Sequence, residues 1–151
     1  MSITFTSGDM FDINADILVN PVNCVGVMGA GLALTFKNKY PDMFQSYKRA
    51  CFARFIEPGK LHLYRTKNNK SIVNFPTKKH WKDKSQYSYI IDGLKQLCEY
   101  LTIQESNVVV AIPALGCGLG GLNNNKVATM IKAALSSTKC KVYVFMKEPN
   151  I

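Results

Sequence analysis

Short apolar runs alternate along the chain with longer amphipathic stretches, a pattern typical of an α/β protein. Proline should end three of the strand-like runs, at Pro21, Pro76 and Pro113, because it has no N–H for a ladder. The run at 108–112 is continuous and rich in β-branched residues, which predicts a strand in the centre of the sheet. The predicted strands are 3–6 (an edge strand), 16–20, 60–65, 71–75, 108–112 and 142–146.

A polar tip at 67–70 separates the strands 60–65 and 71–75, which predicts an antiparallel hairpin. Within the first of these strands, Leu61 and Leu63 should share the buried face. The other strands alternate with helical segments, as they do in α/β sandwiches. We therefore expect an α/β fold with a mixed sheet.

Four segments carry apolar residues at helical spacing. The first includes Leu32 and Phe36 and should stop before Pro41, because the residue preceding a proline disfavours helical backbone angles. The other three should begin at polar residues whose side chains accept hydrogen bonds from the first helical N–H groups. These expected N-caps are Asp42, Ser85, and Asn123 or Asn124.

Length and charge narrow the class of protein. A chain of 151 residues with 47% apolar content fits a single domain, 1–151, with one core. Lys and Arg number 19 against 10 acidic residues, giving a net charge of +9. This balance favours an anionic partner such as a nucleotide or nucleic acid. A surface that is basic without any such partner is the alternative.

The cysteines and the N-terminus indicate a compartment. Five cysteines, without a C-x-x-C pair or metal-ligand spacing to the two histidines, predict neither a disulfide framework nor structural zinc. We expect a cytoplasmic protein without a metal or other cofactor. No signal peptide is visible, and no apolar run approaches the roughly 18 residues of a membrane span, so no membrane association is expected.

Two glycine-bearing loops, 25–31 and 116–121, each follow a predicted strand and precede a predicted helix. A glycine loop that opens a helix presents free backbone N–H groups and the positive end of the helix dipole. Such a loop can bind phosphate without a charged side chain. The pair predicts a site for a diphosphate, whereas either loop alone is a weak signal.

A series of motifs in a fixed order identifies a family resemblance. They are Gly8-Asp9-Met10, Val19-Asn20-Pro21-Val22-Asn23, Met28-Gly29-Ala30-Gly31, Asn74-Phe75-Pro76-Thr77-Lys78 and Ile112 to Leu119. Nearly the whole chain resembles a macrodomain, the ADP-ribose-recognising fold. Within that family it is most similar to the branch of terminal ADP-ribose protein glycohydrolase and the DarG-type DNA ADP-ribosyl glycohydrolase antitoxins. The resemblance implies a three-layer α/β/α sandwich with a mixed, mostly parallel central sheet.

The resemblance also implies the ligand-binding residues. Asp9 would accept a hydrogen bond from the adenine amine, since a carboxylate only accepts; capping the following segment is its alternative role. Asn23 would bind the distal ribose, or else stabilise a turn. Cys117 is expected to pack as a small residue rather than act as a nucleophile. The implied ligand-binding set is Asp9, Met10, Asn23, Val27, Met28, Gly29, Ala30, Gly31, Leu32, Thr77, Leu115, Gly116, Cys117, Gly118, Leu119 and Gly120.

Lys78 matches the catalytic lysine of the related glycohydrolases. An amine near C1″ of ADP-ribose could attack that carbon or transfer protons while the sugar opens, and repulsion from Lys79 and His80 would favour the neutral amine. A solvated basic face is the alternative. One position departs from the human protein glycohydrolase, because Gly120 stands where that enzyme has an aspartate. The departure matches the DNA-directed branch.

Residues 60–84 carry eight cationic side chains and one acid. Cations together with an aromatic plane are what single-strand binding requires. Trp81 is expected to be either a core anchor or a lid over the site. The predicted nucleic-acid contacts are Lys79, His80, Trp81 and Lys82.

We therefore expect a hydrolase that removes ADP-ribose from nucleic acid, above all from thymidine in single-stranded DNA. The resemblance implies an ADP-ribosyltransferase toxin as a partner. Hydrolysis of ADP-ribosyl-glutamate, O-acetyl-ADP-ribose or ADP-ribose 1″-phosphate is the alternative activity. A non-catalytic ADP-ribose-binding module is the second alternative.

Overall fold

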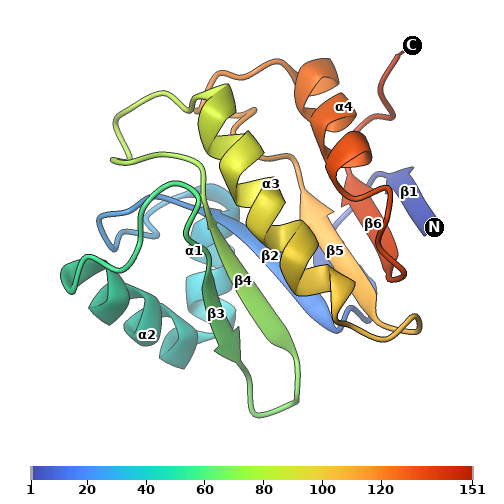
Figure 1. Ribbon diagram of the computed structural model, residues 1–151. Helices are drawn as coiled ribbons and strands as arrows, with labels where there is room; N and C mark the ends of the chain where they lie inside the picture. The colour runs from blue at the N-terminus through green and yellow to red at the C-terminus, as the bar shows by residue number, and fades with distance from the viewer. Residues whose placement is uncertain (1, 151) are drawn as a thin grey trace.

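The computed structural model describes residues 2–150, which form one sheet covered by helices on both faces (Figure 1). Six strands lie in the order β1-β6-β5-β2-β4-β3, and only β3 and β4 pair antiparallel. The predicted mixed, mostly parallel sheet is confirmed, with β5 inside it and β1 at an edge. The strands are β1 (Ser2–Thr6), β2 (Ile17–Val22), β3 (His62–Arg65), β4 (Ser71–Pro76), β5 (Val109–Pro113) and β6 (Lys141–Phe145).

The helices form the two outer layers. Helices α1 (Gly31–Lys39) and α2 (Pro41–Phe52) cover one face, and α3 (Tyr87–Thr102) and α4 (Asn124–Ala134) cover the other. Figure 1 shows α3 and α4 in front of the sheet and α1 behind it. Alternate residues of β2 enter opposite cores: Val19 packs with the α3 and α4 side, and Leu18 with the α1 and α2 side. Among residues 2–150, no helix has the length and apolarity to cross a membrane.

The three prolines that were predicted to end strands belong to those strands. Pro76 and Pro113 are the last residues of β4 and β5, one position later than predicted. Pro21 lies inside β2, opposite Phe75, and the strand continues to Val22. The pairing of β2 with β5 ends at Leu18, so β2 has a ladder on only one side at Pro21. This one-sided pairing is the edge-like setting in which a sheet tolerates proline.

Two of the three predicted helix caps are wrong. Helix α2 has Tyr40 as its N-cap and Pro41 in the first turn, where proline needs no N–H partner, so Asp42 lies inside the helix. Helix α3 has Gln86 as its N-cap, because Ser85 is buried against the second glycine loop. The cap of α4 is confirmed as Asn123, whose Oδ1 accepts from the Lys126 N–H at 3.0 Å.

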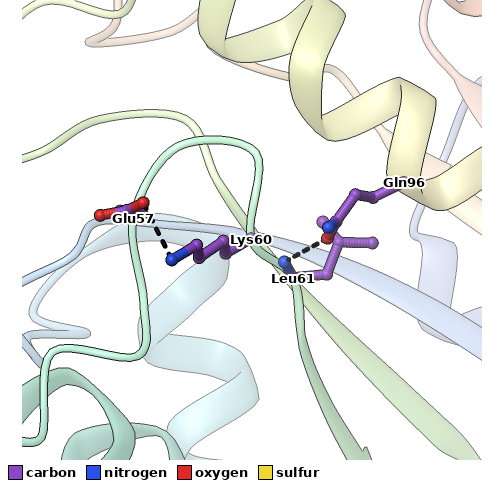
Figure 2. Close-up of polar contacts among 4 residues, drawn as sticks. All are labelled: Glu57, Lys60, Leu61 and Gln96. Atoms are coloured by element: carbon purple, nitrogen blue, oxygen red, sulfur yellow. Dashed lines mark hydrogen bonds and ion pairs between the residues drawn. The ribbon is translucent and has the colours of Figure 1, made fainter.

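The prediction that Leu63 is buried on β3 is also wrong. Leu63 is 49% exposed, whereas His62 and Tyr64 are half-buried on the face covered by α2. Leu61 precedes the strand and packs toward α3, where its N–H donates to Gln96 Oε1 at 3.0 Å (Figure 2). The two leucines therefore differ in burial because α3 contacts the start of this segment, and β3 is an edge strand. Nearby, Lys60 and Glu57 form a salt bridge of 3.1 Å.

A chain of polar side chains, buried at its start and half-buried at its end, connects β2, β4, β3 and α2. Asn20 Nδ2 donates to Asn74 Oδ1 at 3.0 Å, and Asn74 Nδ2 donates to His62 Nδ1 at 3.0 Å. The other ring nitrogen, Nε2, lies 3.1 Å from Ser46 Oγ. Because Nδ1 accepts, Nε2 carries the proton and donates to Ser46. Burial lowers the pKa of His62, which keeps the ring neutral.

This network predicts a pH-dependent stability. With the folded pKa of His62 below its ordinary 6.5, the unfolded chain binds more protons as the pH falls through 6.5. Stability should therefore be constant above about pH 7.5 and decrease below it, until the lowered folded pKa is reached. Urea unfolding at pH 8, 7, 6 and 5 measures the effect, and His62→Gln should flatten the curve.

The matched control is His80→Gln, which leaves the His62 contacts in place and should keep the wild-type decrease. A wild-type slope that His62→Gln does not change would show that other groups cause it.

Candidate functional site

A cavity of about 690 Å³ opens where β2, β4 and β5 end. The carboxyl ends of parallel strands are where α/β sheets form ligand crevices, and this volume is that of a small-molecule site. Both glycine loops and the segment after β4 contribute to its wall. The lining residues are Pro21, Val22, Asn23, Val27, Gly29, Ala30, Gly31, Leu32, Ala33, Thr77, Lys78, Trp81, Ala114, Gly116, Gly118, Leu119 and Gly120.

The side chain of Asn23 organises the first glycine loop. Its Oδ1 accepts from the N–H groups of Val25 (3.1 Å) and Val27 (3.4 Å), and its Nδ2 donates to the Val27 carbonyl at 2.8 Å. The buried Tyr47 hydroxyl lies 2.8 Å from the same Oδ1, and burial raises the pKa of Tyr47, so the hydroxyl remains a donor. Asn23 thus has the turn-stabilising role in this structure while still lining the cavity.

The start of α1 offers backbone donors to the cavity. Its N-cap, Ala30, has no side chain that could cap the helix, and Gly31 begins the helix with a φ of 57°. The first N–H groups of a helix lack partners within the helix. Since Ala30, Gly31 and Leu32 line the cavity, these groups and the positive end of the helix dipole are available to an anion there.

The second glycine loop is closed by its own backbone. The Leu122 N–H donates to the Gly116 carbonyl at 2.9 Å, and the Gly121 N–H donates to the Gly118 carbonyl at 3.1 Å. Gly116 needs the left-handed conformation for this turn, with a φ of 74°. Within residues 2–150, the N–H groups of Gly118 and Leu119 donate to no protein acceptor. Both residues line the same cavity as the start of α1.

Residues 77–79 run beside the first loop and are bonded to it. The Thr77 N–H donates to the Val22 carbonyl at 2.8 Å, and the Cys24 N–H donates to the Lys79 carbonyl at 3.1 Å. Cys24 Sγ lies 3.3 Å from the Lys78 carbonyl. Burial raises the pKa of Cys24 to about 12, so the sulfur keeps its proton and can donate it. These contacts fix the backbone of Lys78 relative to the first loop.

Lys78 and Trp81 are the two large side chains of this segment that line the cavity. Lys78 is half-buried, and its Nζ donates to the Trp81 carbonyl at 3.4 Å. Trp81 is 49% exposed, so the core-anchor interpretation is wrong and the ring lies at the rim. Lys82 Nζ lies 5.0 Å from the centre of the Trp81 ring, and the Lys82 N–H donates to His80 Nδ1 at 3.1 Å.

Some of the predicted ligand residues do not line the cavity. Asp9 is exposed and its Oδ1 accepts from the Phe11 N–H at 2.9 Å, so it caps the short helix η1 (Met10–Asp12). Met10, Met28 and Leu115 are buried in the two cores. Burial raises the pKa of Cys117, which gives the thiol little nucleophilic character.

Other lining residues were missed from the sequence. Pro21 and Val22 precede Asn23 at the end of β2, so the carboxyl-end rule could have found them. Ala33 and Ala114 have no side-chain chemistry that would have identified them. Among residues 2–150, no three His, Cys, Asp or Glu side chains form a cluster that could hold a metal ion.

Comparison with known proteins shows the family. The family model described as Macro domain matches residues 19–131. The chain belongs to the macrodomain family. Several similar proteins are bacterial. The DNA ADP-ribosyl glycohydrolase of Mycobacterium tuberculosis is 45% identical over 136 residues, which cover 87% of this chain and 38% of that protein.

Solved macrodomain structures agree with the fold. The macrodomain of Thermus aquaticus DarG has a TM-score of 0.87 and 39% identity, covering 96% of this chain and 98% of that one. Thermosipho africanus DarTG in complex with ADP-ribose has a TM-score of 0.89 and 32% identity, and the match covers 97% of this chain and 42% of that one. A curated protein of that organism is named DNA ADP-ribosyl transferase-DNA ADP-ribosyl glycohydrolase fusion protein. It is 32% identical over 163 residues, which cover 96% of this chain and 42% of that protein. The chain spans about two fifths of the length of these curated relatives.

Packing around position 120 leaves room only for glycine. A Cβ at this position would lie 2.5 Å from the Gly116 carbonyl oxygen and closer still to Ser85 Oγ. Ser85 is buried, and its own N–H donates to the Gly120 carbonyl at 3.0 Å, so it cannot move away freely. An aspartate therefore cannot occupy position 120 with the loop in this conformation.

Gly120→Ala should consequently destabilise the protein by about 1 to 3 kcal/mol, the usual cost of overpacking. Gly118→Ala is the matched control in the same loop, because a Cβ there meets no atom within 4 Å. Urea unfolding of the two variants provides the comparison. Equal stabilities would show that the loop rearranges around residue 120 at no cost.

Proposed function

We propose that this macrodomain is an ADP-ribosyl hydrolase that removes ADP-ribose from modified nucleic acid, with thymidine-linked ADP-ribose on single-stranded DNA as its substrate. One observation carries the proposal: the amine-bearing side chain of Lys78 lines the same cavity as two loops that present free backbone N–H groups. The names of the relatives from Mycobacterium and Thermosipho support the class of reaction.

The two glycine loops would hold the diphosphate of ADP-ribose. The start of α1 and the residues Gly118 and Leu119 line one cavity, and the unpaired N–H groups of each set favour negative charge. The second carboxylate oxygen of Asp9 makes no hydrogen bond within residues 2–150, which leaves it for the adenine amine. The distal ribose would then lie toward Asn23 and Lys78.

Lys78 would act at C1″. In a covalent route, its neutral amine attacks C1″, the bond from C1″ to the thymine nitrogen breaks, and the amine proton passes to that nitrogen. Water then displaces the lysine, leaving a hydroxyl on C1″ and restoring the amine. In an acid–base route, the same group transfers the protons while the sugar ring opens. The contacts of Cys24 with the 78–79 backbone support either route, because they hold the lysine beside the first loop.

The rim would receive the DNA. Trp81 is half exposed beside the cavity and Lys82 lies over its ring, an arrangement suited to a base and its phosphate. An ADP-ribosyltransferase is the partner that we propose, supported by the Thermosipho relative, whose name joins the two activities in one chain. Cleavage of an ADP-ribosyl-glutamate ester by a lysine–aspartate pair is disfavoured, since position 120 cannot hold the aspartate.

Lys78→Ala should reduce the release of ADP-ribose from a thymidine-modified oligonucleotide by at least about 100-fold, because the reacting amine is removed. Free ADP-ribose should still bind, since the backbone donors remain. Single-turnover hydrolysis and calorimetry measure the two properties separately.

The matched control is Lys79→Ala, which removes a neighbouring cation outside the cavity lining and should retain single-turnover hydrolysis at saturating enzyme. Full activity of Lys78→Ala would exclude the lysine from the chemistry. ADP-ribosyl-glutamate, O-acetyl-ADP-ribose and ADP-ribose 1″-phosphate, tested in the same assay, reveal the alternative hydrolase. Binding without product from any of the four substrates would identify a binding module instead.

A further inference from the structure

A second hollow, the α2 groove, lies between the first glycine loop and the end of α2. Its volume is about 820 Å³. None of the ADP-ribose chemistry described above uses it. The lining residues are Cys24, Val25, Gln45, Lys48, Arg49, Cys51, Phe52 and Arg54.

Exposed apolar side chains lie in this groove and next to it in the sequence. Phe52 lines it and is 92% exposed, and Phe55, three residues later, is 70% exposed. Val25 adds apolar surface from the first loop at 45% exposure. Large apolar side chains exposed together mark an interaction surface more often than isolated ones do. The groove therefore offers flat apolar surface to a ligand.

The C-terminus of α2 contains a residue with a strained backbone. The Phe55 N–H donates to the Ala50 carbonyl at 2.9 Å and the Arg54 N–H donates to the Cys51 carbonyl at 3.0 Å, the hydrogen bonds of a Schellman motif. Arg54 occupies the left-handed position of that motif, with a φ of 63°, where glycine is usual. A glycine at this position would add no side chain. Arg54, despite the strain, adds a long cationic side chain to the groove lining.

The charge of the groove is positive. Lys48, Arg49 and Arg54 line it, and within residues 2–150 none of them forms a salt bridge. Burial, with smaller contributions from Cys51 and Glu57, raises the pKa of the Cys24 thiol, and Glu57 is itself paired with Lys60 (Figure 2). Burial also raises the pKa of Cys51, so both thiols stay uncharged. The surface is complementary to a polyanion that also carries planar groups.

The α2 groove adjoins the cavity across one wall. That wall is the first loop, with Asn23 and Val27 on the cavity side and Cys24 and Val25 on the groove side. Cys24 contacts the backbone of residues 78–79 directly, through its N–H at 3.1 Å and its Sγ at 3.3 Å. A strand whose modified base is beside Lys78 therefore needs to pass only this short segment to reach the groove.

We propose that the α2 groove binds the unmodified nucleotides next to the ADP-ribosylated base of a single-stranded DNA substrate, with Phe52 stacking on a base and Lys48, Arg49 and Arg54 contacting phosphates. The assignment of DNA as the ligand rests on the proposed function, whereas the lining, exposure and charge of the groove do not. Cations beside an exposed ring favour single-stranded nucleic acid over an acidic protein, because stacking requires the ring and phosphates require the cations.

Binding of an unmodified oligothymidine to the full chain, followed by fluorescence anisotropy, tests the groove independently of catalysis. The double charge reversal Lys48→Glu/Arg49→Glu should weaken binding by at least about tenfold and reduce its salt dependence. Phe52→Ala should weaken binding by about fivefold or more. All three side chains are exposed, and a thermal melt verifies that each variant is folded.

The matched controls lie on the opposite helical layer. Lys132→Glu on α4 reverses an exposed cation, and Ile103→Ala after α3 removes an apolar side chain that is 78% exposed. Both should bind the oligonucleotide as the wild type does. Unchanged affinity in both groove variants would overturn the proposal.

Hydrolysis separates the groove from the proposed function. The groove variants should raise KM for an ADP-ribosylated oligonucleotide by about tenfold while leaving kcat/KM for ADP-ribosylated thymidine alone unchanged. Equal effects on both substrates would overturn the groove proposal. If the wild type turns over neither substrate, the proposed function fails, and the anisotropy measurement still decides whether the groove binds single-stranded DNA.

Discussion

The pairing of residues 22–24 with residues 77–79 is the constraint on which the site depends. It extends the contact between β2 and β4 beyond the sheet, through the bonds from Thr77 to Val22 and from Cys24 to Lys79. Backbone hydrogen bonds allow little freedom in register, so the position of Lys78 follows from that of the first glycine loop. Lys78, the residue that we propose to react, is therefore positioned as firmly as a strand residue, although it is only half-buried.

In the proposed function, backbone groups bind the ligand and a side chain performs the chemistry. The diphosphate donors we assign are backbone amides, which carry no formal charge, and small residues such as Gly31 and Gly118 allow a ligand to approach them closely. The amine of Lys78 is the one side-chain group on the cavity wall that can both carry a charge and react. Substitutions that keep the loop conformation should thus affect the chemistry through few positions, whereas a single added methyl at Gly120 affects the whole second loop.

Much of this organisation could be predicted from the sequence, and the failures have physical causes. All six strands could be located, because burial on both faces leaves a continuous apolar run, as at 108–112, and burial on one face leaves alternation, as at 60–65. Leu63 was wrongly predicted to be buried, because alternation identifies which residues share a face of a strand but not whether a helix covers that face. The caps at Asp42 and Ser85 failed because Pro41 fits the first turn of α2 and because Ser85 packs on a loop distant in sequence.

In the candidate site, too, local features could be predicted from the sequence and packing could not. Glycine loops and the resemblance located the cavity wall, since strand ends and helix starts are local features. The orientation of Asn23 toward its own loop, and the burial of Met28 and Leu115, depend on the packed structure. The exposure of Phe52 was equally hidden, because it directly follows Cys51, the last buried residue of α2.

The scarcity of ion pairs has a consequence for how the protein responds to its medium. Residues 2–150 contain one salt bridge, Glu57 with Lys60, although the chain carries a net charge of +9. Most of its cations are thus left to repel one another, and mobile ions relieve that repulsion. The same ions compete for any polyanion that the surface attracts. Rising ionic strength should therefore make the fold more stable while weakening the nucleic-acid binding that we propose, so the conditions that best preserve the protein differ from those that favour the proposed binding.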